Sequence, residues 1–357
     1  MMIIALLIVL LVVMMSTDLK SFADGKTKEK SAEDLSATAF AQQMRIGWNL
    51  GNSLDAHYGN PTGDANLSQE TIWGNPKVNQ ELIDYVASQG FDVIRIPVSW
   101  YYHSYRDKSG VLHISPQWLA RVKEVVNYAY NDHLYVILDS HHDHKIIYTG
   151  VSETQMIQVY ADAQSMWTDI ADSFSSYDHH LILESYNEID NLAKSWNYGE
   201  QAAQQMNHLN QIFVDTVRKS GGYNSDRILM VPTLLDGYSI QFQTGFVLPE
   251  DTVRDKLLVT VHSYNKAYDD KIEYLFQSLG QFSAAVGAPV IIGEFGTTSG
   301  YNPAAYRTVH ASNFVSRAAA HGIKCIWWDN GSDFAVINRK NLKQSDFEMI
   351  KALMVLK

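Results

Sequence analysis

The sequence contains a single cysteine, so no disulfide can form within the chain. A protein of 357 residues, 46% of them hydrophobic, must therefore obtain its stability from a large apolar core. The cysteine, Cys325, lies inside the apolar run 323–328. We predict that it is a small buried hydrophobic residue and not a nucleophile.

Clusters of basic residues are also missing. The chain carries 28 Lys and Arg residues against 39 Asp and Glu residues, a formal net charge of -11, and it has no run rich in Lys or Arg. This balance argues against nucleic acid or an anionic membrane surface as a partner.

The chain lacks the His and carboxylate spacing that is typical of zinc enzymes. Residues 141–144, His-His-Asp-His, could be interpreted as a metal cluster. Adjacent residues on a strand point to opposite faces of the sheet, so His141 and His142 are not expected to bind one ion together. We therefore predict no metal and no cofactor.

The apolar run 2–15 is too short to span a bilayer as a helix, and Ser21-Phe22-Ala23 follows it as a small-x-small cleavage site. This pattern predicts a signal peptide over 1–23, a polar tether over 24–37, and a secreted protein, extracellular or periplasmic, that leaves the membrane after cleavage. No Lys or Arg precedes the run, so an uncleaved anchor is the alternative.

Short apolar runs recur along the rest of the chain, and the intervals between nearly all of them leave room for one helix. The predicted strands are 44–49, 91–96, 134–139, 181–186, 227–231, 257–262, 289–293 and 323–328. Eight strands alternating with helices predict an α/β fold, a (β/α)8 TIM barrel forming a single catalytic domain over 38–357. We expect a monomer.

Helix signals fall between these strands. Ser115-Pro116 predicts a helix start, and apolar residues at helical spacing follow from Trp118 to Ala129. Ser152-x-x-Gln155 and Ser345-x-x-Glu348 fit capping boxes. Gly322 follows an alanine-rich segment as a helix stop.

Two glutamates, Glu188 and Glu294, stand at the ends of apolar runs. In an α/β barrel the carboxyl ends of the strands meet at one mouth. Two carboxylates at that mouth are the pair of catalytic groups that a glycosidase uses. Other polar and aromatic residues occupy the same ends. They are Asn52, Asp55, Arg95, His141, His142, Asp143, Asn187, His262, Tyr264 and Trp328. A solvated cleft that binds a polyol accounts for this ring without burying unpaired polar groups.

Six segments together resemble the family 5 glycoside hydrolases of the cellulase type. They occur in the family's order along essentially the whole mature chain, at 46–56, 90–100, 187–188, 262–264, 293–296 and 326–331. The resemblance implies a (β/α)8 barrel and a retaining double displacement, with Glu188 as general acid/base and Glu294 as nucleophile. A retaining pair lies about 5–5.5 Å apart. Glu188 is then expected to be protonated near working pH, and Glu294 to be ionised.

The same resemblance implies roles for residues around the pair. Arg95 would hold the nucleophile ionised and Tyr264 would donate a hydrogen bond to it. Asn187 would bind the sugar 2-hydroxyl. Further positions are His141 and His262 as active-site histidines, Trp328 as the platform beneath the sugar, and Asn52, Asp55 and His142 as hydroxyl-binding positions of some relatives.

Other polar residues near the predicted mouth have structural interpretations. Glu184 is expected to be buried and hydrogen-bonded, and Asp139 and Asp329 to orient loops or histidines. Asp236 receives no role. Three tryptophans are expected to divide evenly between the core and the cleft. They are Trp48, Trp73 and Trp100.

The leading hypothesis is an exported endo-β-1,4-glucanase whose partner is a β-glucan polysaccharide, cellulose or mixed-linkage glucan. Trp73-Gly74-Asn75 and the segment 327–331 favour a glucanase by family association. One alternative keeps the mechanism but acts on mannan, xyloglucan or xylan. Another is a barrel that binds glycans without hydrolysing them. Because no carbohydrate-binding module is visible, soluble or amorphous chains are the expected substrate.

Overall fold

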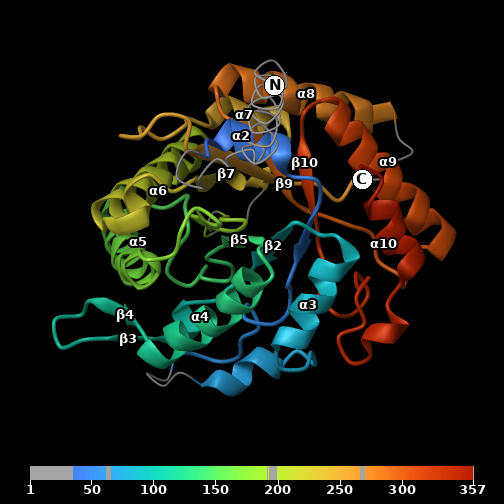
Figure 1. Ribbon diagram of the computed structural model, residues 1–357. Coiled ribbons are helices and arrows are strands. Elements are labelled where there is room, and N and C mark those ends of the chain that lie inside the picture. The colour runs from blue at the N-terminus through green and yellow to red at the C-terminus, as the bar shows by residue number, and fades with distance from the viewer. Residues whose placement is uncertain (1–34, 62–65, 191, 193–198, 266–269, 357) are drawn as a thin grey trace, which may run out of the picture. The chain divides into compact units, whose positions relative to one another are not determined.

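Eight parallel strands close into a barrel, in the spatial order β1-β10-β9-β8-β7-β6-β5-β2 (Figure 1). The strands are β1 (Gly47–Asn49), β2 (Val93–Ile96), β5 (Tyr135–Leu138), β6 (Leu181–Glu184), β7 (Leu229–Gly237), β8 (Leu257–His262), β9 (Val290–Phe295) and β10 (Lys324–Trp327). Each lies within or overlaps one predicted strand, so the predicted (β/α)8 barrel is confirmed.

This computed structural model describes residues 35–61, 66–190, 192, 199–265 and 270–356. The predicted signal peptide and residues 24–34 of the predicted tether lie outside the described residues. Residues 36–357 form one unit by their internal contacts. Within the described part of the chain, no helix combines the length and the apolar composition needed to cross a bilayer.

Helices surround the strands (Figure 1). They are α2 (Ala37–Gln43), α3 (Gln80–Gln89), α4 (Pro116–Asn131), α5 (Glu153–Phe174), α6 (Glu200–Lys219), α7 (Ile240–Gly245), α8 (Asp270–Val286), α9 (Ala304–Ala320) and α10 (Phe347–Leu353). Short 3-10 turns lie at Leu67–Thr71, Tyr101–His103, Gly222–Ser225 and Leu342–Gln344. A hairpin of β3 (Ser104–Arg106) and β4 (Leu112–Ile114), which the sequence did not predict, projects beside α4 (Figure 1).

Most helix signals act as predicted. Pro116 is the first residue of α4, and the Ser152 capping box is complete at the start of α5. Gly322 adopts a left-handed φ of 74° just after α9. The prediction of a capping box at Ser345 is wrong. The Ser345 hydroxyl bonds to Asn338 and Leu342 instead, and the stronger acceptor Asp346 caps α10.

The core surrounds the barrel and fills its interior. Cys325 is buried, as predicted. Trp48 and Trp100 belong to the core, whereas Trp73 is 40% exposed. The indole N–H of Trp48 donates to Asp329 at 3.0 Å, so this core residue also fixes the loop after β10.

Candidate active site

The two predicted carboxylates meet at the mouth of the barrel. Glu188 follows β6, and Glu294 lies near the end of β9, directly across from His262 on β8. One oxygen of each carboxylate and a ring nitrogen of His262 all lie within 4.8 Å of one another. This spacing fits a retaining pair, whose carboxyl groups are about 5–5.5 Å apart, and is too short for the roughly 6.5–9.5 Å of an inverting pair.

Both oxygens of Glu294 are held by hydrogen bonds. Arg95 Nη1 donates to Oε1 at 2.8 Å, and the Tyr264 hydroxyl donates to Oε2 at 2.7 Å. The carboxylate therefore has a fixed orientation at the mouth.

Arg95 is fully buried at the centre of the barrel and is surrounded by acids. Its Nε and Nη2 atoms donate to Glu184 at 2.7 and 2.9 Å, and Nη2 also lies 2.6 Å from an Asp139 oxygen. Asn187 accepts a further bond from Nη2 at 3.0 Å. Glu184 is thus buried and hydrogen-bonded, as predicted, and one guanidinium links the nucleophile candidate to residues at the carboxyl ends of β5 and β6.

Glu188 is held from two sides. Its backbone N–H donates to Asp236 Oδ2 at 2.6 Å, and its Oε1 atom accepts from His262 Nδ1 at 2.8 Å. The residue has a left-handed φ of 46°, which is uncommon for a residue with a side chain. The surrounding contacts must therefore impose this conformation.

The charges around this pair differ from those expected. Burial raises the pKa of Glu294, and the opposing effects of His262 and Arg95 do not cancel it. Burial acts upward on Glu188 too, but the hydrogen bond and charge of His262 outweigh it and lower the Glu188 pKa. Burial lowers the pKa of His262, yet Glu294, Asp236 and Glu188 raise it to about 10. These shifts favour a charged His262 beside an ionised Glu188 in the substrate-free site.

An aromatic wall borders the carboxylates. Trp328 is half-buried just after β10, and its ring stacks on His141 with centroids 5.5 Å apart and planes 6° from parallel. Asp139 fixes the histidine ring, because its Oδ2 atom lies 2.9 Å from His141 Nδ1. Gly51 lies so close that a Cβ there would stand 2.7 Å from Trp328 Cη2.

Comparison with known proteins agrees with this geometry. The family model for cellulase (glycosyl hydrolase family 5) matches residues 55–334. The chain is 35% identical to endoglucanase A of Ruminococcus albus over 321 residues, which is 84% of this chain and 85% of that protein. The chain belongs to glycosyl hydrolase family 5. It is a glycoside hydrolase of the endo-1,4-β-glucanase type.

Solved structures of family 5 share the whole barrel. A GH5-4 broad specificity endoglucanase from Ruminococcus champanellensis with bound cellotriose has a TM-score of 0.83 at 36% identity, covering 90% of this chain and 99% of that one. A GH5 lichenase from Caldicellulosiruptor sp. F32 has a TM-score of 0.81 at 33% identity, covering 90% and 95%. These relatives argue against a barrel that binds glycans without hydrolysing them.

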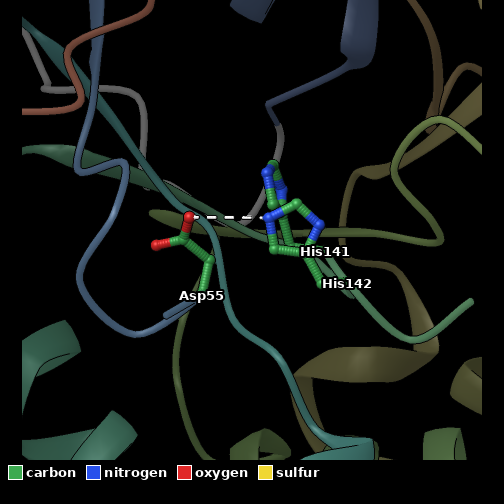
Figure 2. A group of neighbouring side chains, drawn as sticks. All are labelled: Asp55, His141 and His142. Atoms are coloured by element: carbon green, nitrogen blue, oxygen red, sulfur yellow. Dashed lines mark ion pairs between the residues drawn. The ribbon is translucent and has the colours of Figure 1, made fainter. Parts of the chain in front are cut away.

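A second group of the predicted residues lies on the wall of this family 5 site. Asp55 is buried, and its carboxylate accepts the backbone N–H groups of Asn52 and Ser53 at 3.0 and 2.7 Å. Burial raises the pKa of Asp55 to about 7, against the lowering effect of these N–H groups. His142 Nε2 lies 3.9 Å from Asp55 Oδ2, as the dashed line in Figure 2 marks.

The prediction that His141 and His142 point apart is wrong. β5 ends at Leu138, so neither histidine is on a strand and the alternation rule does not apply. Their ring centroids are 4.5 Å apart, and one ligand atom from each, together with one from Asp55, lies within 4.8 Å of the others (Figure 2).

Asp236 received no role in the sequence analysis, yet the structure places it beside Glu188 and His262. The pairing of β7 with β8 shifts register between Pro232 and Gly237, and this irregularity brings Asp236 beside His262. The predicted strand ended at Val231, whereas β7 continues to Gly237. The sequence already places Asp236 near the end of the fifth predicted strand, but its contact with His262 exists only after folding.

Proposed function

We propose that this protein is an exported, retaining endo-β-1,4-glucanase that hydrolyses internal bonds of cellulose chains or mixed-linkage β-glucan. Glu294 is the nucleophile and Glu188 the general acid/base. The observation that carries the assignment is the asymmetry of the close carboxylate pair. Arg95 and Tyr264 hold both oxygens of Glu294, whereas 43% of the Glu188 side chain is exposed to the cleft.

The first step forms a covalent intermediate. An oxygen of Glu294 bonds to the anomeric carbon while the bond from that carbon to the glycosidic oxygen breaks. Glu188 gives its proton to the departing oxygen, and the shortened chain leaves. Arg95 and Tyr264 keep the attacking carboxylate oriented throughout this step.

The second step releases the sugar. Water attacks the anomeric carbon, Glu188 accepts a proton from that water, and the ester bond to Glu294 breaks. Two inversions at one carbon return the original β configuration. We assign the sugar 2-hydroxyl to Asn187, which bonds to Arg95 and lies next to Glu188 in sequence, and this contact strengthens in the transition state.

Glu188 and His262 share one proton along their 2.8 Å hydrogen bond. Without substrate the ion pair is favoured, because the hydrogen bond and charge of His262 lower the Glu188 pKa and water reaches the exposed part of the side chain. A bound glucan would displace that water, and desolvation favours the neutral form of both groups. The proton would then move to Glu188, where the leaving oxygen needs it.

The Trp328 ring offers a flat face for the sugar at the cleavage point, with His141 as a hydrogen-bonding neighbour. We assign substrate hydroxyls also to Asn52, Asp55 and His142, which line the same wall. A wider substrate range that includes xyloglucan is the second candidate. It is favoured by the similarity to a broad specificity endoglucanase and to a xyloglucan-specific endo-β-1,4-glucanase of family 5.

Export is proposed from the apolar run 2–15 and the small-x-small site before residue 24. We further propose that the mature chain acts as a monomer without a cofactor.

The test is a product-size and reducing-end assay on carboxymethyl cellulose, mixed-linkage β-glucan, xyloglucan, xylan and mannan. Wild type and Glu188→Gln are run side by side. Rapid shortening of the two glucans, lost in the variant, is the expected result. Preferential cleavage of mannan, xylan or xyloglucan would overturn the proposed substrate class. Unchanged activity of Glu188→Gln would overturn the acid/base assignment.

A further inference from the structure

Three groups of side chains in the described part of the chain bring potential metal ligands within 4.8 Å of one another. Two of them contain His262 and the carboxylates of the reactive centre. In those groups Arg95 already pairs with Glu184 and Glu294, so a metal ion would meet an existing buried cation. The third group is Asp55, His141 and His142 (Figure 2), and its His141 ring stacks on Trp328.

We propose that Asp55, His141 and His142 form a site for a divalent transition-metal ion of the zinc type, and that the bound ion competes with the glucan. The site has no part in the hydrolytic steps. The competition rests on the proposed function, whereas the binding of the ion does not.

The three donor atoms lie within 4.8 Å of one another, and one pair is close to the spacing that an ion requires. Metal–nitrogen and metal–oxygen bonds of about 2.0–2.2 Å place the two donor atoms about 3.4 Å apart in a tetrahedral site. His142 Nε2 and Asp55 Oδ2 are 3.9 Å apart, so a closure of about half an ångström suffices. A rotation of the half-buried His142 ring would provide it.

Two of the ligands are already held by second partners. The His141 Nδ1 atom pairs with Asp139 at 2.9 Å, which leaves Nε2 as the coordinating nitrogen. A carboxylate on the second nitrogen is the usual support of a metal-binding histidine. The Asp55 carboxylate is fixed by two backbone N–H groups. The site is therefore largely organised before an ion arrives.

The burial pattern provides access. Asp55 and His141 are buried, and the His142 side chain is 29% exposed. Three protein ligands with one side open to solvent is the arrangement of a zinc site that keeps a position for water. The His57 ring, with its centroid 5.2 Å from that of His142, is a further donor close to this open side.

The donor set selects the class of metal. Two imidazoles and one carboxylate suit Zn²⁺, Ni²⁺ and Cu²⁺, whereas Ca²⁺ and Mg²⁺ prefer oxygen ligands. An ion on His141 would lie beside the ring that stacks on Trp328. It would therefore occupy the wall that the glucan must contact.

The test measures metal binding directly and needs no activity. Untagged full-length protein is treated with EDTA, desalted and titrated with Co²⁺, whose visible absorption reports low-coordinate binding. The variants are His142→Gln and Asp55→Asn. His321→Gln is the matched control, because it removes a histidine that pairs with Glu273 at 2.6 Å outside the cleft.

We expect one ion per wild-type chain, at least about tenfold weaker binding in both site variants, and unchanged binding in His321→Gln. Zn²⁺ should displace Co²⁺, and cellotetraose should weaken the binding of either ion. Thermal unfolding checks that each variant is folded. If Asp55→Asn fails this check, His142→Gln alone decides.

The proposal is overturned if wild type binds no Co²⁺, or if a folded His142→Gln variant binds it as tightly as wild type does. Binding that cellotetraose does not affect would overturn the competition. Hydrolysis of β-glucan measured in EDTA tests the proposed function separately, so the two can fail independently.

Discussion

Asp236 joins the two partners of the proton shared at the mouth of the barrel. Its Oδ2 atom accepts the Glu188 backbone N–H at 2.6 Å, and its Oδ1 atom lies 3.8 Å from His262 Nε2. Both Asp236 and Glu188 have left-handed backbone conformations, with φ of 49° and 46°. One buried carboxylate therefore supports the unusual backbone of the acid/base candidate and attracts the proton on its histidine.

Replacement of Asp236 by Asn should move the pH dependence of hydrolysis. Burial raises the pKa of Asp236, whereas the charge of His262 opposes that rise, and Asp236 in turn raises the pKa of His262. Asn keeps an acceptor for the Glu188 N–H but removes this acid. The Glu188–His262 pair would then lose its shared proton at a lower pH than in wild type. We expect the alkaline limb of kcat/KM to move down by about one pH unit, equivalent to about 1.4 kcal/mol.

Asp236→Ala is the companion variant, because it also removes the hydrogen bond to Glu188. It should lower kcat further while moving the limb by a similar amount. A uniform loss of activity at every pH in Asp236→Asn, with no displacement of the limb, would show that Asp236 has a structural role alone.

The nucleophile can be identified by trapping. A 2-deoxy-2-fluoro cellobioside with a good leaving group should label Glu294, and mass spectrometry of the digested protein locates the modified peptide. Glu294→Gln should show no label and at least about a 10⁴-fold loss of kcat. Glu184→Gln is the matched control, because Glu184 also bonds to Arg95 but lies beneath the cleft. The Glu184→Gln variant should still be labelled at Glu294, more slowly. In wild type, a label on Glu184 in place of Glu294 would contradict the assignment.

The position of Trp328 depends on the absence of a side chain at Gly51. A Cβ at Gly51 would stand 2.7 Å from the Trp328 ring and 3.0 Å from the Asp329 carbonyl oxygen. We expect Gly51→Ala and Trp328→Ala each to raise KM for β-glucan by about five- to tenfold, since aromatic stacking contributes about 1 kcal/mol. Gly300→Ala, where a Cβ would meet no atom within 4 Å, should leave KM unchanged. Equal KM values for Gly51→Ala and wild type would refute this dependence.

Stability should depend strongly on the buried ion pair of Arg121 and Glu70. Arg121 on α4 donates to both oxygens of Glu70 at 2.8 Å, and both side chains are buried. Arg121→Ala leaves the Glu70 charge buried and unpaired, at a cost of about 3–5 kcal/mol. Arg45→Ala breaks the partly exposed pair with Asp92 and should cost about 0–1 kcal/mol. Urea unfolding of the three proteins compares these costs, and a similar midpoint for both variants would contradict the argument.

The barrel was predictable because its strands are buried on both faces and read as short apolar runs. The same logic placed Glu188 and Glu294 at one mouth, since the carboxyl ends of parallel strands meet there. Their contacts with Arg95 and Tyr264 came from the family resemblance and not from spacing. The features that the sequence did not predict are short, local elements. The β3–β4 hairpin has only three residues in each strand, too few for a periodic signal.

Asp236 and His142 show a different limit. Both owe their positions to irregular backbone, a register shift in β7 and a loop that begins where β5 ends. A two-residue period describes neither segment. The lowered pKa of Glu188 could not be predicted either, because it depends on His262, which is 74 residues away in the sequence and in contact only after folding.

The buried Cys325 makes this barrel a convenient object for single-molecule spectroscopy. Burial raises the pKa of its thiol, and no other cysteine exists in the chain. The native protein should therefore not react with maleimide dyes. A cysteine introduced at Tyr301, which is 91% exposed in the loop after β9, would carry one fluorophore beside the mouth of the barrel. The native thiol would become reactive only when the barrel opens, so one dye could report the cleft and a second the rare unfolded molecule.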